Sequence, residues 1–213
     1  MSPGPALFMR GLAVGFSIAA PVGPIGLLCI RRTLAESRLA GLATGLGAAC
    51  ADAVYGAVAA FGLSWVTRVL VGQQLAIRLA GGAFLVYLGV RTFLKRPAER
   101  AAEAGGAGLA GPFASTFFLT LTNPMTILSF VAVFAGLGLG AGSGGGGGAA
   151  LMVLGVLLGS AAWWLILSGA VARLRSRFDA RRLGWVNRLS GALIAGFGVF
   201  ALAGSFRIAG RVR

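Results

Sequence analysis

The sequence predicts an all-α integral membrane protein in which six transmembrane helices form two inverted three-helix repeats, with the first and fourth helices broken. Of its 213 residues, 57% are hydrophobic and only 11% are charged, whereas soluble domains carry roughly 25% charged residues. Six apolar runs reach the ~20 residues that a spanning helix needs, and prolines interrupt the first and the fourth. Because short connections separate the runs, the whole chain is expected to form a single membrane domain.

The six runs suggest an internal duplication. Residues 8–94 would form repeat one, residues 95–112 a cytoplasmic linker and residues 113–206 repeat two. A repeat of three helices makes the second copy enter the membrane from the opposite side. Gly41-x-x-x-Gly45 has a counterpart in Gly155-x-x-x-Gly159, and such faces pack helices closely within one chain or between two, so a homodimer is possible. In chain order, the predicted spans are residues 8–30, 40–63, 69–94, 113–139, 149–172 and 186–206.

The first run is broken by Pro21-Val22-Gly23-Pro24. Each proline lacks an N–H donor and crowds the carbonyl four residues back, at a cost of ~3 kcal/mol in a helix interior. Within the bilayer, backbone groups freed in this way are tolerated only where they face protein or a water-filled cavity. We therefore expect Pro21, Gly23 and Pro24 to shape a polar site inside the bundle.

The fourth run has its own break at Asn123-Pro124, which should free the carbonyl of Thr120. Paired interruptions in corresponding helices of two halves point to the substrate site of a transporter. The two breaks together therefore predict a binding site near the middle of the membrane, between the broken helices.

Arginines set the predicted orientation. The formal net charge is +14, with 19 basic residues, but they lie between the apolar runs. Thirteen of them fall in the first, third and fifth connections, beginning with Arg31, Arg32 and Arg38. By the positive-inside rule these connections are cytoplasmic and both termini lie outside. We interpret the basic residues as topology signals, and we expect no binding of nucleic acid.

Asp52 is the acidic residue expected within a span, because Glu36, Glu99, Glu103 and Asp179 fall in predicted connections. A carboxylate at that depth costs ~2.5–3.5 kcal/mol on insertion scales and should face the bundle interior with a partner. It either exchanges protons or holds a substrate ammonium group, or it forms a structural hydrogen bond to a helix break. Tyr55 follows on the same helical face, where it shares the site or only packs.

The fourth run is unusually polar. Thr116, Thr120 and Asn123 fall on one helical stripe. Their side chains either line a hydrophilic path or bond back to their own helix. Trp163 and Trp164 lie mid-span in the fifth run, so at least one should pack on a cavity or on another helix.

Several functions are disfavoured. The chain has no histidine, which removes histidine-dependent nucleophilic catalysis and most zinc sites, so neither an enzyme nor a bound cofactor or metal is expected. Cys29 and Cys50 both lie in spans and are interpreted as small core residues. The glycine-rich stretch 136–150 is expected to be a flexible outer linker.

Taken in order, these motifs resemble the LysE-type family of lysine and homoserine/threonine exporters. The resemblance rests on Pro21-Val22-Gly23-Pro24, on Gly41-x-x-x-Gly45 leading to Asp52 and Tyr55, and on Gly81 to Gly89, Thr122-Asn123-Pro124 and Arg188-Leu189-Ser190-Gly191. It covers nearly the whole chain, although the glycine-rich outer stretch is not part of the family pattern.

The resemblance implies export of amino acids or close derivatives across the bacterial inner membrane, driven by the proton gradient. Pro21, Gly23 and Pro24 would shape the first break, Asp52 would be the ionisable coupling group, and Asn123 with Pro124 would form the second break. Two alternatives remain. A metal or inorganic-cation exporter should have more membrane carboxylates, and a membrane thiol-redox protein should have cysteines in symmetry-related helices.

Overall fold

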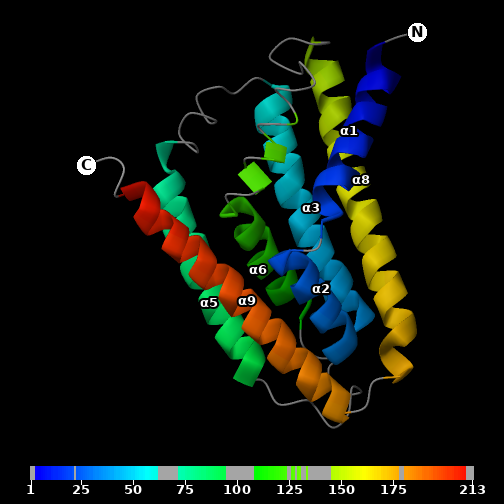
Figure 1. Cartoon of the computed structure of the whole chain (residues 1–213). Helices are drawn as coiled ribbons and strands as arrows, with labels where there is room; N and C mark the ends of the chain where they lie inside the picture. Colours follow the sequence, from blue (N-terminus) through cyan, green and yellow to red (C-terminus); the bar gives the residue numbers. More distant parts are fainter. Residues whose placement is uncertain are drawn as a thin grey trace.

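A computed structural model of the chain describes residues 3–21, 23–61, 72–94, 108–123, 126–127, 129–130, 133, 145–177 and 180–209. Within these ranges the backbone forms helices and turns and no strand, in agreement with the predicted all-α class (Figure 1). The elements are α1 (Pro3–Ala19), α2 (Pro24–Ala35), α3 (Arg38–Ala60), α5 (Gln74–Leu94), α6 (Ala110–Leu121), α8 (Gly145–Leu174), the short 3₁₀ helix η2 (Arg175–Arg177) and α9 (Ala180–Ala209).

Four of the described helices, α3, α5, α8 and α9, are long and apolar enough to cross a membrane. Together α1 and α2 make a fifth candidate, a span bent by 79° at its break. α6 is apolar but has only 12 residues, and it begins inside the range predicted as a linker. Most of the remainder of the predicted fourth span lies outside the described residues. The protein is therefore a multi-pass helical membrane protein.

Local chemistry explains where the helices around the first break start and stop. α1 ends at Ala19, before Pro21, and α2 begins at Pro24 with Gly23 as its extended N-cap. Proline suits a first helical position because its missing N–H needs no partner there. The next helix, α3, starts after Ser37, whose Oγ accepts a hydrogen bond from the Ala40 N–H at 3.0 Å. Such a cap satisfies one of the free donors at a helix start.

The bundle is held together by contacts between the first and second halves of the chain. α1 lies along α8, α5 lies along α9, and α3 packs against both α8 and α6 (Figure 1). α2 occupies the space between α3, α8 and α9. Close packing of α1 on α8 depends on glycine, because a methyl group on any of four residues would overlap a backbone carbonyl of the facing helix. These residues are Gly11, Gly15, Gly155 and Gly159.

Two apolar clusters form the interior. The first cluster consists of Ala19, Ile25, Leu28, Cys29, Ala48, Ala49, Leu88, Leu119, Trp164 and Ile194. The second cluster consists of Leu7, Val14, Tyr55, Ile127, Phe130, Met152 and Val156. Cys29 is fully buried in the first cluster, as predicted. The same prediction is wrong for Cys50, which is partly exposed and belongs to neither apolar cluster.

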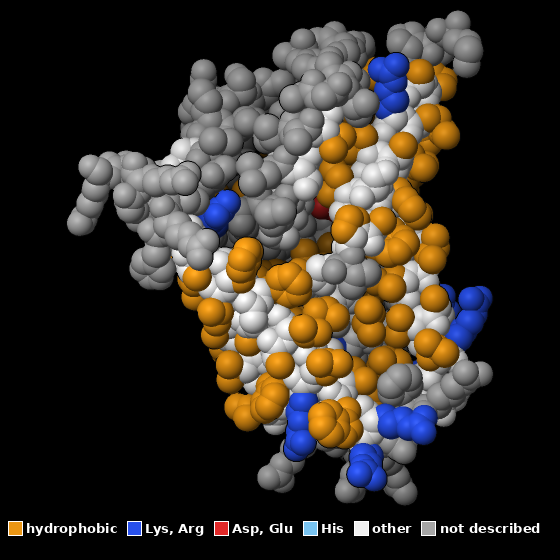
Figure 2. Space-filling model, in the orientation of Figure 1, with side chains coloured by type: hydrophobic (Ala, Val, Ile, Leu, Met, Phe, Trp, Pro, Cys, Tyr) orange, Lys and Arg blue, Asp and Glu red, His pale blue; other side chains and the backbone are white. Residues whose placement is uncertain are grey.

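Outward-facing side chains match a lipid environment. Large apolar residues are exposed along α5, α8 and α9, for example Tyr87, Ile166 and Phe200. Figure 2 shows hydrophobic side chains over the middle of the visible face and several basic side chains at the end where α8 ends and α9 begins. The first residues of α1 and the last of α9 lie at the opposite end (Figure 1).

The prediction of a flexible linker over 136–150 is wrong for its last six residues. Residues 145–150 form the first turns of α8, and Ala149 is buried there. The helix starts here although each glycine costs ~1 kcal/mol in a helix. The rest of that stretch lies outside the described residues.

Candidate functional site

The first break presents the start of α2 to the interior of the bundle. Pro21 is exposed and follows the end of α1, whereas Gly23 and Pro24 are half-buried at the start of α2. Ile25 and Gly26, which carry the first N–H groups of the new helix, are buried. A helix start carries partial positive charge and favours anionic groups. The geometry therefore places an anion-favouring helix end inside the protein.

The second break follows α6, which ends at Leu121. The Asn123 N–H donates to the Thr120 carbonyl at 3.1 Å, so the prediction that this carbonyl is freed is wrong. Helical backbone resumes beyond the break, where the Ile127 N–H donates to the Asn123 carbonyl at 3.2 Å. The turn therefore supplies a donor for a carbonyl that has no partner within the helix. Pro124 lies outside the described residues.

Both breaks border the second apolar cluster. Ile18, one residue before the end of α1, packs against this cluster, and so does Leu121 at the end of α6. Tyr55 belongs to the same cluster, and its hydroxyl donates to the Leu121 carbonyl at 2.5 Å. The tyrosine therefore caps the end of α6, and the hydrogen bond ties α3 to the second break.

Asp52 lies between the two apolar clusters and is only 3% exposed. The Ser160 hydroxyl donates to Asp52 Oδ2 at 2.7 Å, and Trp164 Nε1 donates to Ser160 Oγ at 3.2 Å. Ser160 and Trp164 lie on α8, one and two turns after Val156 of the second cluster. The carboxyl group therefore joins α3 to α8 across the core, through neutral donors.

Among the described residues, Asp52 forms no salt bridge with an arginine or lysine. A buried carboxyl without a cationic partner is costly to keep ionised, so this position favours proton uptake or a cationic ligand. The predicted interior placement of Asp52 is confirmed. The predicted packing of a mid-span tryptophan is also confirmed by Trp164, which is 4% exposed.

The residues of the polar stripe on α6 differ in their hydrogen bonding. Thr120 is 1% exposed, and its Oγ1 has no hydrogen-bond partner within the described part of the chain. Thr116 instead bonds back to the Pro112 carbonyl at 3.0 Å and accepts a hydrogen bond from Arg32. Asn123, the third member, is half-buried in the turn. Thr120 therefore has a buried hydroxyl for which the described residues offer no hydrogen-bond partner.

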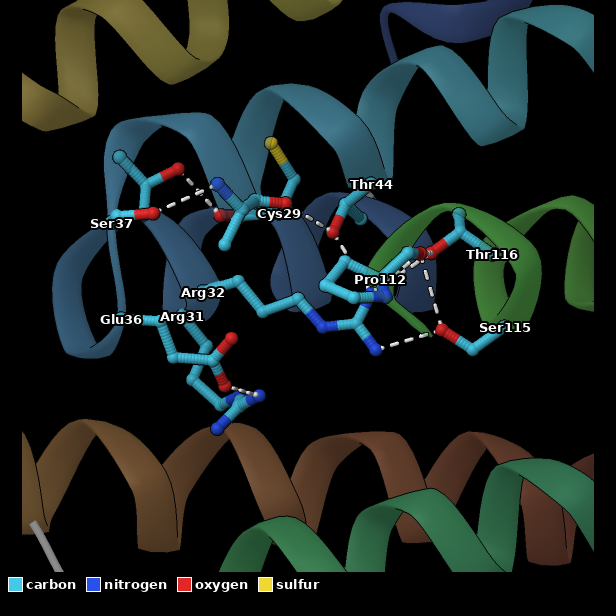
Figure 3. Close-up of polar contacts among 11 residues, drawn as sticks. Cys29, Arg31, Arg32, Glu36, Ser37, Thr44, Pro112, Ser115 and Thr116 are labelled. Atoms are coloured by element: carbon cyan, nitrogen blue, oxygen red, sulfur yellow. Dashed lines mark hydrogen bonds and ion pairs between the residues drawn. The ribbon is translucent and has the colours of Figure 1, made fainter. Parts of the chain in front are cut away.

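Sequence reasoning missed a buried arginine centre at the end of α2. Arg31 and Arg32, predicted to be topology signals in a connection, are 4% and 7% exposed and lie within α2. The Arg32 guanidinium joins α2 to α3 and α6 through neutral acceptors (Figure 3). Its nitrogens donate to Thr44 Oγ1 at 2.8 Å, Ser115 Oγ at 2.9 Å, the Pro112 carbonyl at 3.0 Å and Thr116 Oγ1 at 3.1 Å.

One sequence signal was available for this placement. Ser37 is a typical N-cap residue before an apolar run, so a new helix is expected to begin just after it. The helix that starts at Pro24 can then continue almost to Glu36. Arg31 and Arg32 then fall in its last turns rather than in a loop. The signal was outweighed by the expectation that arginines flank membrane helices.

Arg32→Lys is expected to destabilise the protein more than Arg32→Met does. A lysine keeps the buried charge but cannot reach hydroxyls on both α3 and α6, and lost hydrogen bonds to a charged group cost about 1.5–3 kcal/mol each. Methionine removes the charge together with its desolvation cost. Thermal unfolding of the detergent-purified variants measures the order. A lysine variant as stable as wild type would contradict the bridging role of the guanidinium.

Comparison with known proteins gives the family. The model of the LysE type translocator family matches residues 16–205. The chain belongs to the LysE type translocator family. No solved structure matches this translocator significantly.

Three curated relatives cover most of the translocator. The "Putative amino acid efflux protein YcgF" of Bacillus subtilis is 25% identical over 91% of this chain and 94% of its own length. The "Threonine efflux protein" of Escherichia coli K12 is 27% identical over 91% of this chain and 96% of its own length. The "Uncharacterized membrane protein PA4757" of Pseudomonas aeruginosa is 32% identical, over 88% and 90% respectively.

Proposed function

We propose that this translocator exports amino acids or close derivatives across the bacterial inner membrane, by alternating access coupled to the proton gradient. The observation that carries the proposal is Asp52, a buried carboxyl held by Ser160 between α3 and α8 and unpaired with any cation in the described residues. A protonatable group at the contact between two halves can link proton uptake to their relative movement. The relatives named as amino acid and threonine efflux proteins support the substrate class.

The proposed architecture is a pair of inverted repeats, residues 8–94 and 113–206, joined by a cytoplasmic linker. The packing pattern supports it. A twofold axis relating the two repeats would place α1 on α6, α3 on α8 and α5 on α9. The contact of α1 with α8 would then correspond to the contact of α6 with α3, and both are present. The contact of α3 with α8 and that of α5 with α9 would each map onto itself. The arginine-rich end would be cytoplasmic, with both termini outside.

The proposed substrate site lies between the two breaks, at the level of Asp52. The carboxylate of the amino acid would meet N–H groups at the start of α2. The ammonium group would meet Asp52. The hydroxyl of Thr120, which has no hydrogen-bond partner among the described residues, would bind a polar group. The residues proposed to form this site are Pro21, Gly23, Pro24, Asp52, Tyr55, Thr120, Asn123 and Pro124.

Efflux from proteoliposomes tests the function. Vesicles loaded with single radiolabelled amino acids, L-threonine first, are expected to lose at least one of them faster than protein-free vesicles do. A pH gradient should increase the rate, because proton movement would drive the cycle. If no amino acid leaves faster but a divalent cation does, the proposed substrate class is wrong.

A further inference from the structure

Arg31 carries hydrogen-bond donors that find no acceptor in the part of the chain that the structure describes. Its side chain is 5% exposed, and its Nη2 pairs with Glu36 Oε1 at 3.0 Å. Its Nε and Nη1 are fully covered and have no partner in the described structure. An unsatisfied buried donor on a charged group costs more than one on a neutral group. This position therefore favours an additional acceptor.

Among the described residues, positive charge exceeds negative charge around the end of α2. Besides Arg31 and Arg32, Arg175 reaches this end, and its Nη2 donates to the Glu36 carbonyl at 2.5 Å and its Nε to the Leu34 carbonyl at 3.3 Å. The one salt bridge found in the described residues is that of Arg31 with Glu36. The negative end of the α2 dipole, equivalent to about half a charge, offsets only part of the excess.

The two neighbouring arginines point to different sides of α2. Figure 3 shows the Arg32 guanidinium among Pro112, Ser115 and Thr116, and that of Arg31 beside Glu36 on the side nearer to the α9 ribbon. α2 and α9 are in contact along this side. The Arg31 guanidinium is therefore enclosed in protein and does not face lipid.

We propose that Arg31 binds the carboxylate of the transported amino acid at the arginine-rich end of the bundle, before the substrate reaches the level of Asp52. This inference rests on the proposed export of amino acids. A guanidinium is suited to a carboxylate because its planar N–H groups match the two oxygens. Thr44, beside Arg32, and Asp52 are eight residues apart on α3, or ~12 Å along the helix. The arginine centre and Asp52 therefore lie at different levels of the bundle, and in this proposal they act in succession.

Ligand binding to the purified full-length protein tests the proposal by thermal stabilisation in detergent. The probes are the exported amino acid of the efflux panel (L-threonine if threonine is exported), its carboxamide and sodium acetate. Arg31→Gln is expected to weaken binding of the amino acid and of acetate by about tenfold or more, as loss of charged hydrogen bonds implies. Binding of the carboxamide should not change. The exposed Arg91, replaced by glutamine, serves as the matched control and should behave as wild type.

Glu36→Gln separates binding from a structural role. Removing the carboxylate that competes for Arg31 is expected to tighten binding of the amino acid, opposite in sign to Arg31→Gln. If both variants weaken the acid and the carboxamide alike, Arg31 is structural and the proposal is overturned. It is also overturned if Arg31→Gln releases copurified anionic lipid while amino-acid binding stays unchanged. If acetate binding depends on Arg31 but no amino acid is exported, the anion site stands and the proposed function fails.

Discussion

Efflux through Asp52→Asn is expected to lose its dependence on the pH gradient completely. Asparagine keeps the size of the side chain and can still bond to Ser160 Oγ, 2.7 Å away in the native protein, but it cannot take up or release a proton. The proposed cycle then has no step that the gradient drives. Initial rates from proteoliposomes with and without the gradient measure the effect, using the amino acid that leaves wild-type vesicles fastest.

A matched variant distinguishes coupling from packing at this position. Ser160→Ala removes the hydrogen bond to Asp52 and leaves the carboxyl group in place, so efflux should remain gradient-dependent even if it is slower. Gradient-dependent efflux that survives Asp52→Asn would return this carboxyl to a structural role. Asp52 would then be a cross-link between α3 and α8 rather than the coupling group.

Gly159→Ala is expected to destabilise the protein severely. A methyl group at this position overlaps the backbone of Leu12 on α1. Backbone cannot rotate away as a side chain does, so α1 and α8 would have to move apart. Inserting a methyl group into a well-packed core costs about 1–3 kcal/mol, and a clash with backbone should lie at or above the upper end of that range. Thermal unfolding and the yield of monodisperse protein in detergent report the loss.

Gly196→Ala is the control, because the same substitution there adds a methyl group to open space. No neighbouring atom lies within 4 Å of a Cβ built on Gly196 in α9. In a helix, alanine is favoured over glycine by ~1 kcal/mol, so this variant should be as stable as wild type or slightly more stable. Equal stability of the two alanine variants would show that α1 and α8 do not depend on close contact.

Features with a strong local chemical signal were predictable from the sequence. The break at Pro21 to Pro24 is set by residues that cannot continue a helix, and the interior placement of Asp52 follows from the cost of a carboxylate in lipid. The family was recognised because its motifs surround these same positions.

Features that depend on partners distant in sequence were not predictable. Arg32 is buried because hydroxyls of α3 and α6 surround its guanidinium, and no local pattern identifies those partners. Residues 145–150 are helical as the first turns of the long helix α8, although their glycine composition indicates a linker. The Thr120 carbonyl accepts a hydrogen bond from the Asn123 N–H in the turn. Counting only the helical hydrogen bonds that a proline removes does not predict this bond.

The interleaving of the two halves has a consequence for biosynthesis. α1 and α3 both pack against α8, and α5 packs against α9, so the helices made first have their main partners at the end of the chain. During translation the early helices are in the membrane before their partners have been synthesised. Asp52 lacks its hydrogen bond from Ser160 until more than a hundred further residues have been added. A chain truncated before α8 lacks the main partner of α1 and the partner of α5, and we expect membrane proteases to remove it rather than let it persist as half of a transporter.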